Sequence, residues 1–381
     1  MKHKALLILL TLSIYHQIES KYVHNECRSK KLEKCYCGDT FYLERIYFLV
    51  NCTGQGFRDP SMLQELPPDT EALIFSGHNI ETLPANIFGE NMNLTKLKAI
   101  DMSNNRIKNI KGKTFHHIPN VELLILNHNE IIINDDYNDY DDTIYHHPRV
   151  FSNFINLQEL HLTNAFKDNT DEQLANDLHD IFVKSNLTKL YKLHLEQNEI
   201  KRFKDDKVFC NLPSLKQLYL GTNDLQHINF DLKCLNLQFL DLENNKITQL
   251  SKKDLASFDR SGKSLTVDIR GNPLKCSQAA DLYNWMNRTN VNIRYKEQLE
   301  CDLKSTSGKR FVVNMKELAE VKHAKFSKAV TVLLVVLVLV LISLLGAYGY
   351  MHRDKIGMRM APILDTVSRK VQYTTIDSQI V

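Results

Sequence analysis

The chain has 381 residues, and its 48 lysine and arginine residues nearly balance 45 aspartate and glutamate residues, giving a net charge of +3 with histidine neutral. This balance gives no signal for nucleic-acid binding. The sequence also lacks the GxSxG, HExxH, P-loop and dinucleotide motifs, and its 15 histidines show no metal-ligand spacing. Neither an enzyme nor a cofactor is predicted.

The N-terminus predicts a secretory signal peptide over residues 1–20. Met1 to Lys4 is basic, Ala5 to Ile14 is apolar, and Ser20 is a small residue at a suitable cleavage position. The apolar segment is too short to be a membrane anchor. We therefore expect the following residues to reach an oxidising compartment.

Residues 21–62 form a cysteine-rich segment that contains Cys27, Cys35, Cys37 and Cys52. In a secreted protein such cysteines are expected to form disulfides, and here they would build an N-terminal cap. The alternative is zinc binding by Cys35 and Cys37.

Residues 63–274 repeat one apolar pattern. The stretch "LKAIDMSNNRI", Leu97 to Ile107, follows the form L-x-x-L-x-L-x-x-N-x-L, which is the leucine-rich repeat. Regular copies begin at Val121, Leu190, Leu215 and Leu237, and degenerate copies lie around His78, from Leu157 to Ala165 and from Val267 to Leu274. With about eight units, the chain is predicted to be an α/β solenoid, because one unit cannot bury its apolar face alone.

The asparagine of each repeat is predicted to belong to the scaffold. Its amide carries both donors and acceptors, so a stack of such side chains satisfies the backbone groups that each sharp turn leaves inside the coil. Asn105 is the example in the stretch quoted above.

Two insertions are expected, near residues 132–150 and 166–186. The first holds the acidic loop Asp135 to Asp142, with Tyr137 and Tyr140. A solvated loop is the first reading of it; a loop for a basic partner, with sulfated tyrosines, and a calcium site are the alternatives. The second insertion, 171–183, has apolar residues at helical spacing and predicts an amphipathic helix packed on the solenoid.

Cys210 and Cys234 lie in corresponding segments of successive coils. They either form an inter-coil bridge or remain two buried thiols. A C-terminal cap is predicted over residues 275–321, because "NPLKC" is followed by Trp285 and by Cys301, which would pair with Cys276.

A transmembrane helix is predicted over residues 329–351, which carry no charge and exceed the ~20 residues needed to cross a bilayer. Residues 322–328 precede it, and residues 352–381 form the tail. Because a translocated N-terminal domain overrides the flanking charges, we expect a plasma-membrane protein with its N-terminus outside.

Both sides of this membrane offer modification or sorting motifs. The sequons at Asn93, Asn186 and Asn287 are expected glycosylation sites, whereas Asn51 is discounted because Cys52 would hold it close to the cap. In the tail, Tyr373 and Ile376 spell an endocytic signal for cytosolic adaptors, and the terminal "DSQIV" is a weaker match to PDZ ligands.

The order of these parts resembles the trophoblast glycoprotein family. The resemblance rests on the capped array with its long insertion, on "DIRGNPLKC", on the single membrane helix and on the tail that begins "YMHRDKIGMRM". It implies a cell-surface glycoprotein without enzyme activity, from a family associated with restraint of Wnt signalling. Gln278 replaces a family cysteine and no fourth cysteine follows Cys301, so one bridge is missing, while the pair Cys276 and Cys301 can still form. "CDLK" also replaces the family's Cys-Ala-Tyr-Pro, which puts any inherited role of that surface in doubt.

The concave face of the sheet is the predicted ligand-binding surface, because strand alternation turns the residues beside each inward leucine onto it. Ile74, Leu123 and Ile125 are expected to face solvent as an apolar patch at one end. An aromatic and acidic stretch follows toward the other end, with two histidines before it. The full set of candidates is Ile74, Leu123, Ile125, His161, His194, Tyr219, Phe239, Asp241, Glu243 and Asp268.

Together these features predict a type I membrane protein that binds a protein ligand at the cell surface and modulates signalling. What the resemblance implies, inhibition of Wnt signalling, is the leading hypothesis for the pathway. An adhesion molecule of the neuronal leucine-rich type is the alternative. Nucleic acid is not an expected partner.

Overall fold

The computed structural model describes residues 27–90, 94–132, 150–167, 171–261, 264–304 and 310–352. The chain divides into two compact units, one ending at Lys316 and the other beginning at Glu317. The predicted signal peptide, the sequon at Asn93, the acidic loop Asp135 to Asp142 and the tail motif of Tyr373 and Ile376 all lie outside the described residues.

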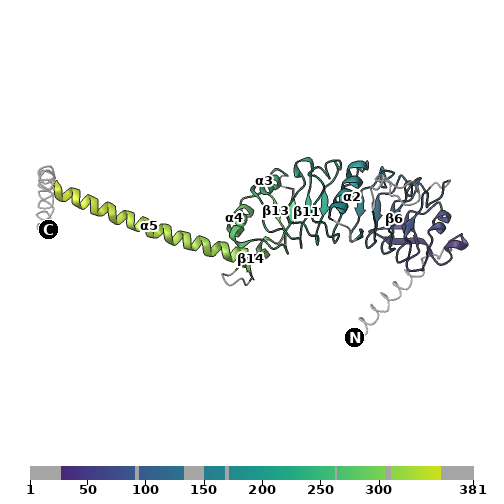
Figure 1. The fold of residues 1–381 in the computed structure, drawn as a ribbon, viewed down its shortest axis with the longest axis horizontal. Coiled ribbons are helices and arrows are strands. Elements are labelled where there is room, and N and C mark those ends of the chain that lie inside the picture. The colour runs from purple at the N-terminus through teal and green to yellow at the C-terminus, as the bar shows by residue number, and fades with distance from the viewer. Residues whose placement is uncertain are drawn as a thin grey trace, which may run out of the picture. The chain divides into compact units, whose positions relative to one another are not determined.

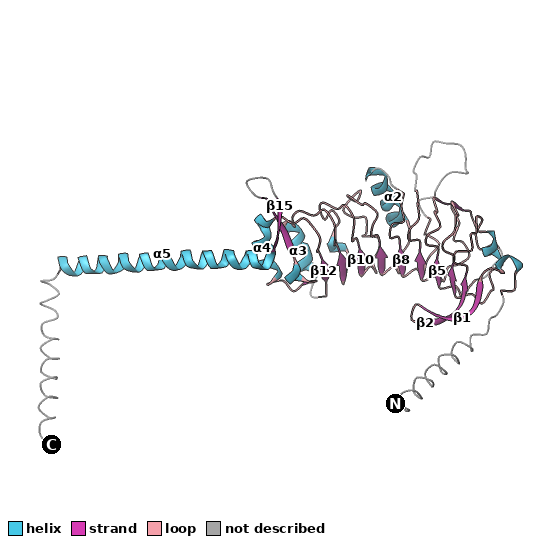
Figure 2. Cartoon of the chain, turned by 90° about the horizontal axis from the view of Figure 1, so that it is seen from below, coloured by secondary structure: helices cyan, strands magenta, loops and turns pink. Residues whose placement is uncertain are grey.

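The first unit is built on one sheet, 11-stranded in the described residues, and its strands lie side by side along one face of the solenoid (Figures 1 and 2). The order is β1-β2-β3-β5-β7-β8-β9-β10-β11-β12-β13; β1 and β2 are antiparallel, and every later neighbour is parallel. The strands are β1 (Tyr36–Tyr42), β2 (Arg45–Asn51), β3 (Ala72–Ile74), β5 (Ala99–Asp101), β7 (Leu123–Ile125), β8 (Glu159–His161), β9 (Lys192–His194), β10 (Gln217–Tyr219), β11 (Phe239–Asp241), β12 (Thr266–Asp268) and β13 (Asn292–Ile293).

Shorter elements complete this unit. Two small sheets pair β4 (Thr82–Leu83) with β6 (Asn109–Ile110) and β14 (Glu300–Lys304) with β15 (Arg310–Asn314). The α-helices are α2 (Asp171–Lys184), α3 (Lys252–Ser261) and α4 (Cys276–Met286). The 3-10 turns are η1 (Lys30–Leu32), η2 (Ser61–Glu65), η3 (Leu232–Cys234) and η4 (Lys296–Gln298). The predicted leucine-rich solenoid with disulfide-bonded ends is confirmed.

Each repeat contributes a strand whose middle residue points into the core. Leu193, Leu218 and Leu240 occupy that middle position in three neighbouring strands, and each is fully buried. The residues on either side of the middle one point the opposite way and remain partly exposed in these strands. We call the surface formed by these flanking residues the sheet face.

Buried asparagines join consecutive coils, as the repeat pattern predicted. The Asn223 side chain accepts hydrogen bonds from the backbone N–H groups of Asn198 (2.9 Å) and Ile200 (3.1 Å). Its amide donates to the carbonyls of Leu195 (2.9 Å) and Leu220 (3.0 Å). Asparagines with the same position and the same kind of partner are Asn105, Asn129, Asn198, Asn245 and Asn272.

The asparagine column is interrupted at the first repeat, where His78 stands instead. Its ring is buried and packs against Phe75, with ring centroids 4.3 Å apart, and against Phe57, at 5.2 Å. Burial lowers the pKa of the imidazole, and a contact with the Cys52 backbone opposes this only in part. A neutral His78 therefore fills the space as an aromatic ring, while its backbone N–H still donates to the Asn105 side chain (2.9 Å).

The opposite side of the solenoid is closed by phenylalanines and by α2, which lies away from the strands (Figure 2). Phe115 and Phe154 pack with ring centroids 5.0 Å apart, and Phe203 packs on Phe209 at 4.9 Å. The helix predicted in the second insertion is confirmed as α2. Its apolar residues Leu174, Leu178, Ile181 and Phe182 are buried.

All eight cysteines are paired. Cys27 bonds to Cys37 and Cys35 to Cys52 in the N-terminal cap, so the zinc alternative for Cys35 and Cys37 does not apply. Cys276 bonds to Cys301 across the C-terminal cap. Cys210 and Cys234 also form a bridge, because η3 and the preceding coil bring their Cα atoms to 5.3 Å.

The second unit contains α5 (Met315–Met351), a helix whose 37 residues begin before the predicted span 329–351. Over the described residues it is the one helix that is long and apolar enough to cross a membrane. Within the part of the chain that the structure describes this is the single candidate span, and it follows the repeats in the sequence.

Replacing Asn223 by alanine should cost about 2–4 kcal/mol of unfolding free energy, because it leaves buried backbone donors and acceptors of two coils without partners. The matched control is Asn211→Ala, at an exposed residue with one hydrogen bond, to the Val183 carbonyl (3.0 Å), and it should cost less than about 1 kcal/mol. Urea unfolding of the purified protein measures both. Equal losses would show that the column is dispensable.

Removing the bridge at the C-terminal cap with Cys276→Ser and Cys301→Ser should cost about 2–5 kcal/mol, because the end of the core opens. We expect that variant to be retained inside cells. Cys210→Ser with Cys234→Ser is the comparison: this bridge joins a partly exposed residue to an exposed one, and its loss should reduce surface levels less. Flow cytometry of tagged proteins gives the answer, and normal surface levels without the cap bridge would contradict its role.

Candidate protein-binding face

The structure places the predicted binding residues on or beside the sheet face but divides them into separate groups. Four rings contact one another in the centre, three carboxylates gather toward the C-terminal end, and two apolar residues lie under the N-terminal hairpin. Ile125 is partly buried between these groups. The rings are His161, His194, Tyr219 and Phe239. The carboxylates are Asp241, Glu243 and Asp268, and the apolar pair is Ile74 and Leu123.

The four central rings form a continuous strip across β8, β9, β10 and β11, and we call it the ring strip. The centroids of His161 and His194 lie 4.2 Å apart, and those of His194 and Tyr219 lie 4.1 Å apart with nearly parallel planes. Tyr219 and Phe239 follow at 5.1 Å. Parallel pairing places His161, His194 and Tyr219 in register, and all four rings are partly exposed. The strip is therefore an aromatic surface that is accessible in part, and the side chains of His161 and His194 are 22% and 19% exposed.

Carboxylates beside the ring strip are held by donors from neighbouring strands. Glu159 contacts His161 (3.4 Å), the Tyr191 hydroxyl (2.5 Å) and the Lys192 ammonium group (2.9 Å). These hydrogen bonds, that of His161 first, lower the pKa of Glu159 to about 2. Burial in turn lowers the pKa of His161, so a neutral imidazole is favoured there.

Glu196 is held in the next coil. It contacts Nδ1 of His194 at 2.8 Å and accepts a hydrogen bond from the Thr163 hydroxyl at 2.9 Å. The two histidines of the strip therefore each have a carboxylate neighbour two residues away in the chain. These contacts fix the ring planes and leave the ring faces for packing.

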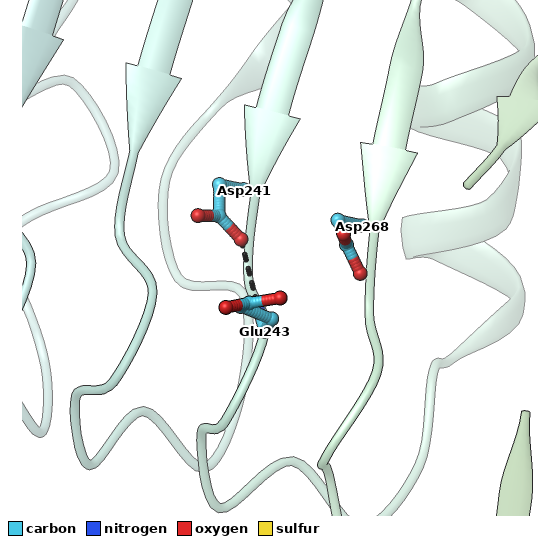
Figure 3. A group of neighbouring side chains, drawn as sticks. All are labelled: Asp241, Glu243 and Asp268. Carbon is cyan, nitrogen blue, oxygen red and sulfur yellow. Dashed lines mark hydrogen bonds between the residues drawn. The ribbon is translucent and has the colours of Figure 1, made fainter. Parts of the chain in front are cut away.

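Asp241, Glu243 and Asp268 form the acidic group drawn in Figure 3, with carboxylate atoms within 4.8 Å of one another. This spacing alone is compatible with a bound cation, but an arginine already supplies positive charge. Arg270 contacts Glu243 and Asp268, each at 2.6 Å, and Asp268 is only 1% exposed. We therefore assign these two carboxylates to an internal ion-pair network and propose no metal there.

Asp241 differs from its neighbours because it has no ion-pair partner among the described residues. Its carboxylate accepts a hydrogen bond from the Glu243 backbone N–H (2.9 Å). Burial, together with the charges of Glu243, Asp268 and Glu196, raises its pKa from 3.8 to about 6. The ionised side chain is therefore destabilised in the folded protein.

The expected exposure of Ile74 and Leu123 requires correction. Both pack against Tyr47, Leu49, Ala72 and Ala99, together with Tyr42, and are partly buried. The reason is the hairpin β1–β2, which extends over the sheet face of β3, β5 and β7; Arg45 near its tip pairs with Glu122 (3.7 Å). The alternating apolar residues in "TFYLERIYFLV" were the available sequence signal for this hairpin.

Gly221 is a sheet-face residue that the sequence reasoning missed. It lies two residues after β10, where the neighbouring coils carry Glu196 and Glu243. A Cβ atom at this position would lie 2.8 Å from Asp241 Oδ2, closer than side-chain atoms approach. Glycine is thus needed so that the Asp241 carboxylate can lie against β10 beside Tyr219. The sequence signal for this residue was a glycine at the position where the neighbouring coils carry glutamates.

The predicted glycosylation sites that are described lie away from the ring strip. Asn186 follows α2, Asn287 ends α4, and both are exposed. Asn51 is partly buried at the end of β2, where its side chain accepts hydrogen bonds from Thr53. Glycans at Asn186 and Asn287 would leave the ring strip accessible.

Comparisons with known proteins agree with this fold. The family model described as "Leucine rich repeat" matches residues 71–131 and 188–247. Trophoblast glycoprotein of Macaca fascicularis is 31% identical over 67 residues, which span 18% of this chain and 16% of that relative.

Two solved structures are similar. Human 5T4, titled Wnt-activated inhibitory factor 1 and trophoblast glycoprotein, aligns with 24% identity and a TM-score of 0.56 over 66% of this chain and 87% of that one. A leucine-rich repeat protein of Leptospira interrogans aligns with 21% identity and a TM-score of 0.43 over 64% of this chain and 53% of that one. The 5T4 likeness supports the fold.

Replacing Asp241 by asparagine should stabilise the protein at neutral pH by about 1–2 kcal/mol, after allowance for partial exposure. A raised pKa means that the folded state binds the proton more tightly, so stability is lost as the pH rises from 3.8 through about 6. The advantage of the variant should shrink as the pH falls through this window. Thermal unfolding at several pH values tests this, with the exposed Asp281→Asn as control; a destabilised Asp241→Asn would contradict it.

Proposed function

From a leucine-rich repeat solenoid followed by one apolar helix, we propose that this protein is a non-enzymatic cell-surface receptor component that binds a protein ligand on its sheet face. The observation that carries the proposal is the ring strip. Partly exposed aromatic side chains are frequent anchors of protein interfaces, because they bury large areas at low entropic cost. Here His161, His194 and Tyr219 are aligned by strand register, Phe239 packs on Tyr219 from the next strand, and carboxylates contact both histidines.

The proposed outcome of binding is modulation of signalling, with restraint of Wnt signalling as the specific hypothesis. It is supported by the sequence match to trophoblast glycoprotein and by the name Wnt-activated inhibitory factor 1 carried by the similar solved structure. The matched segment spans 16% of the relative's length, so the pathway is a proposal for this chain.

We place the repeats outside the cell and the tail inside. The predicted signal peptide and the four disulfides support this orientation, because disulfides persist in oxidising compartments. All eight cysteines and all four sequons precede the predicted membrane span. The tail motif of Tyr373 and Ile376 would then meet cytosolic adaptors.

Tyr219→Ala combined with Phe239→Ala should weaken ligand binding at least about tenfold while surface levels stay normal, because the two central anchors are removed. The full protein displayed on cells is probed with a panel of soluble cell-surface ectodomains. Phe311→Ala removes an aromatic side chain that is 51% exposed outside the sheet face, and it is the matched control.

Deleting residues 135–142 should have the smaller effect. If that deletion abolishes binding and the double variant does not, the sheet face is not the ligand site. Aggregation of cells that express the protein would instead favour the adhesion alternative, because adhesion requires a partner on an opposing cell. A signalling modulator can act on receptors in its own membrane and does not require aggregation.

A further inference from the structure

We propose that Tyr219 and Asp241 together receive an arginine side chain of the protein partner, whose guanidinium group pairs with the carboxylate and packs beside the Tyr219 ring, which His194 and Phe239 already contact. This inference rests on the proposed ligand binding by the sheet face and names the chemistry of the partner. Charge complementarity supports it, because Asp241 is a carboxylate without an ion-pair partner among the described residues and an arginine carries the opposite charge.

The structure contains two internal examples of the same arrangement. Arg45 lies 4.6 Å from the Tyr47 ring centroid and pairs with Glu122 (3.7 Å). At the other end of the sheet, Arg270 lies 4.2 Å from the Tyr295 ring centroid and pairs with Asp268 (2.6 Å). A planar guanidinium group suits this combination, because it stacks on an aromatic face while its N–H groups reach a carboxylate.

Tyr219 and Asp241 supply the ring and the carboxylate of a third such arrangement. They face each other in the parallel register of β10 and β11, and Gly221 gives the carboxylate its place beside the ring. No arginine or lysine of the described residues forms an ion pair with Asp241. The guanidinium group that completes this arrangement is therefore expected to come from a second molecule.

The other carboxylates of this half of the face are already paired. Glu159 contacts Lys192, Glu196 contacts His194, and Glu243 contacts Arg270. Asp268 is shared by Arg270 (2.6 Å) and Arg294 (3.8 Å). Glu196 is held by an imidazole, which carries a charge only when protonated, whereas Asp241 is the one of these five with no side-chain ion-pair partner among the described residues.

Keeping an unpaired carboxylate here costs stability, as its raised pKa indicates. Perturbed acids of this kind concentrate at functional sites. The charged groups that surround it are Glu196, Glu243 and Asp268, with Arg270 and Arg294 beyond them, and Tyr219 lies on the neighbouring strand. An arginine from a partner would relieve this repulsion, and its binding should weaken as the pH falls through about 6 and Asp241 takes up a proton.

The test uses the full-length protein in detergent with labelled glycine and tyrosine, observed by NMR. The probes are N-acetylarginine amide, N-acetylcitrulline amide and N-acetyllysine amide. We expect the arginine probe to shift the Gly221 amide and Tyr219 ring signals, and the neutral citrulline probe to leave them in place. Asp241→Asn should weaken arginine binding about tenfold, since it removes a charge-assisted hydrogen bond.

Two further variants keep the interpretation clear. Gly221→Ala retains the charge but displaces the carboxylate, so it should also weaken the arginine probe. Asp281→Asn removes an exposed carboxylate on α4 and should change nothing. Unfolding curves of each variant establish that it is folded.

The inference is overturned if arginine and citrulline probes act alike, if lysine acts as strongly as arginine, or if Asp241→Asn leaves arginine binding intact. Such results are separable from the proposed function. If Tyr219→Ala with Phe239→Ala abolishes partner binding while the probes fail, the sheet face binds a partner by other chemistry. If the probes behave as expected and partner binding survives that double variant, the face binds a free guanidinium group but not the partner, and both the proposed ligand site and this inference fail.

Discussion

The buried asparagine amides of six repeats are the interaction on which the rest of the structure depends; His78 and Ala165 stand in two others and donate their backbone N–H groups to the next asparagine. Every coil turns sharply and leaves backbone groups in an apolar interior. An unpaired group there costs about 1–3 kcal/mol, a large part of a net stability of about 5–15 kcal/mol. Each asparagine pairs groups of its own coil and of its neighbour, as the four hydrogen bonds of Asn223 illustrate. The coils are thereby locked at one spacing, and the short strands between them fall into register.

The parallel register of the short strands aligns side chains from different coils into one surface. His161, His194 and Tyr219 come from three coils, yet parallel pairing brings their rings within 4.2 Å of the next. Such stacking needs no recognition between the aromatic residues themselves, because the backbone positions them. The scaffold and the proposed binding face are therefore coupled: loss of a buried amide would disturb the ring strip even though no amide touches it.

At both ends of the sheet face, an arginine of the chain itself pairs with a carboxylate and lies over a tyrosine ring. At the N-terminal end the hairpin β1–β2 carries Arg45 over Tyr47 to Glu122, and at the C-terminal end Arg270 joins Tyr295 to Asp268. Both ends are thus covered or neutralised by the chain itself. Asp241, between them, is left with its charge, and this difference separates the proposed site from the rest of the face.

The sequence by itself determined the repeat fold, the inward leucines, the role of Asn105 and the location of both caps, because each follows from periodicity along the chain. It also placed His161, His194 and Tyr219 in one column. Tertiary structure decided which candidates act together, because contacts between coils depend on how far each side chain reaches. Ile74 packs against residues of the β1–β2 hairpin, Asp268 is buried and paired with Arg270, and Asp241 lies where Gly221 leaves room for its carboxylate. These outcomes depend on distances across strands, which a linear pattern does not contain.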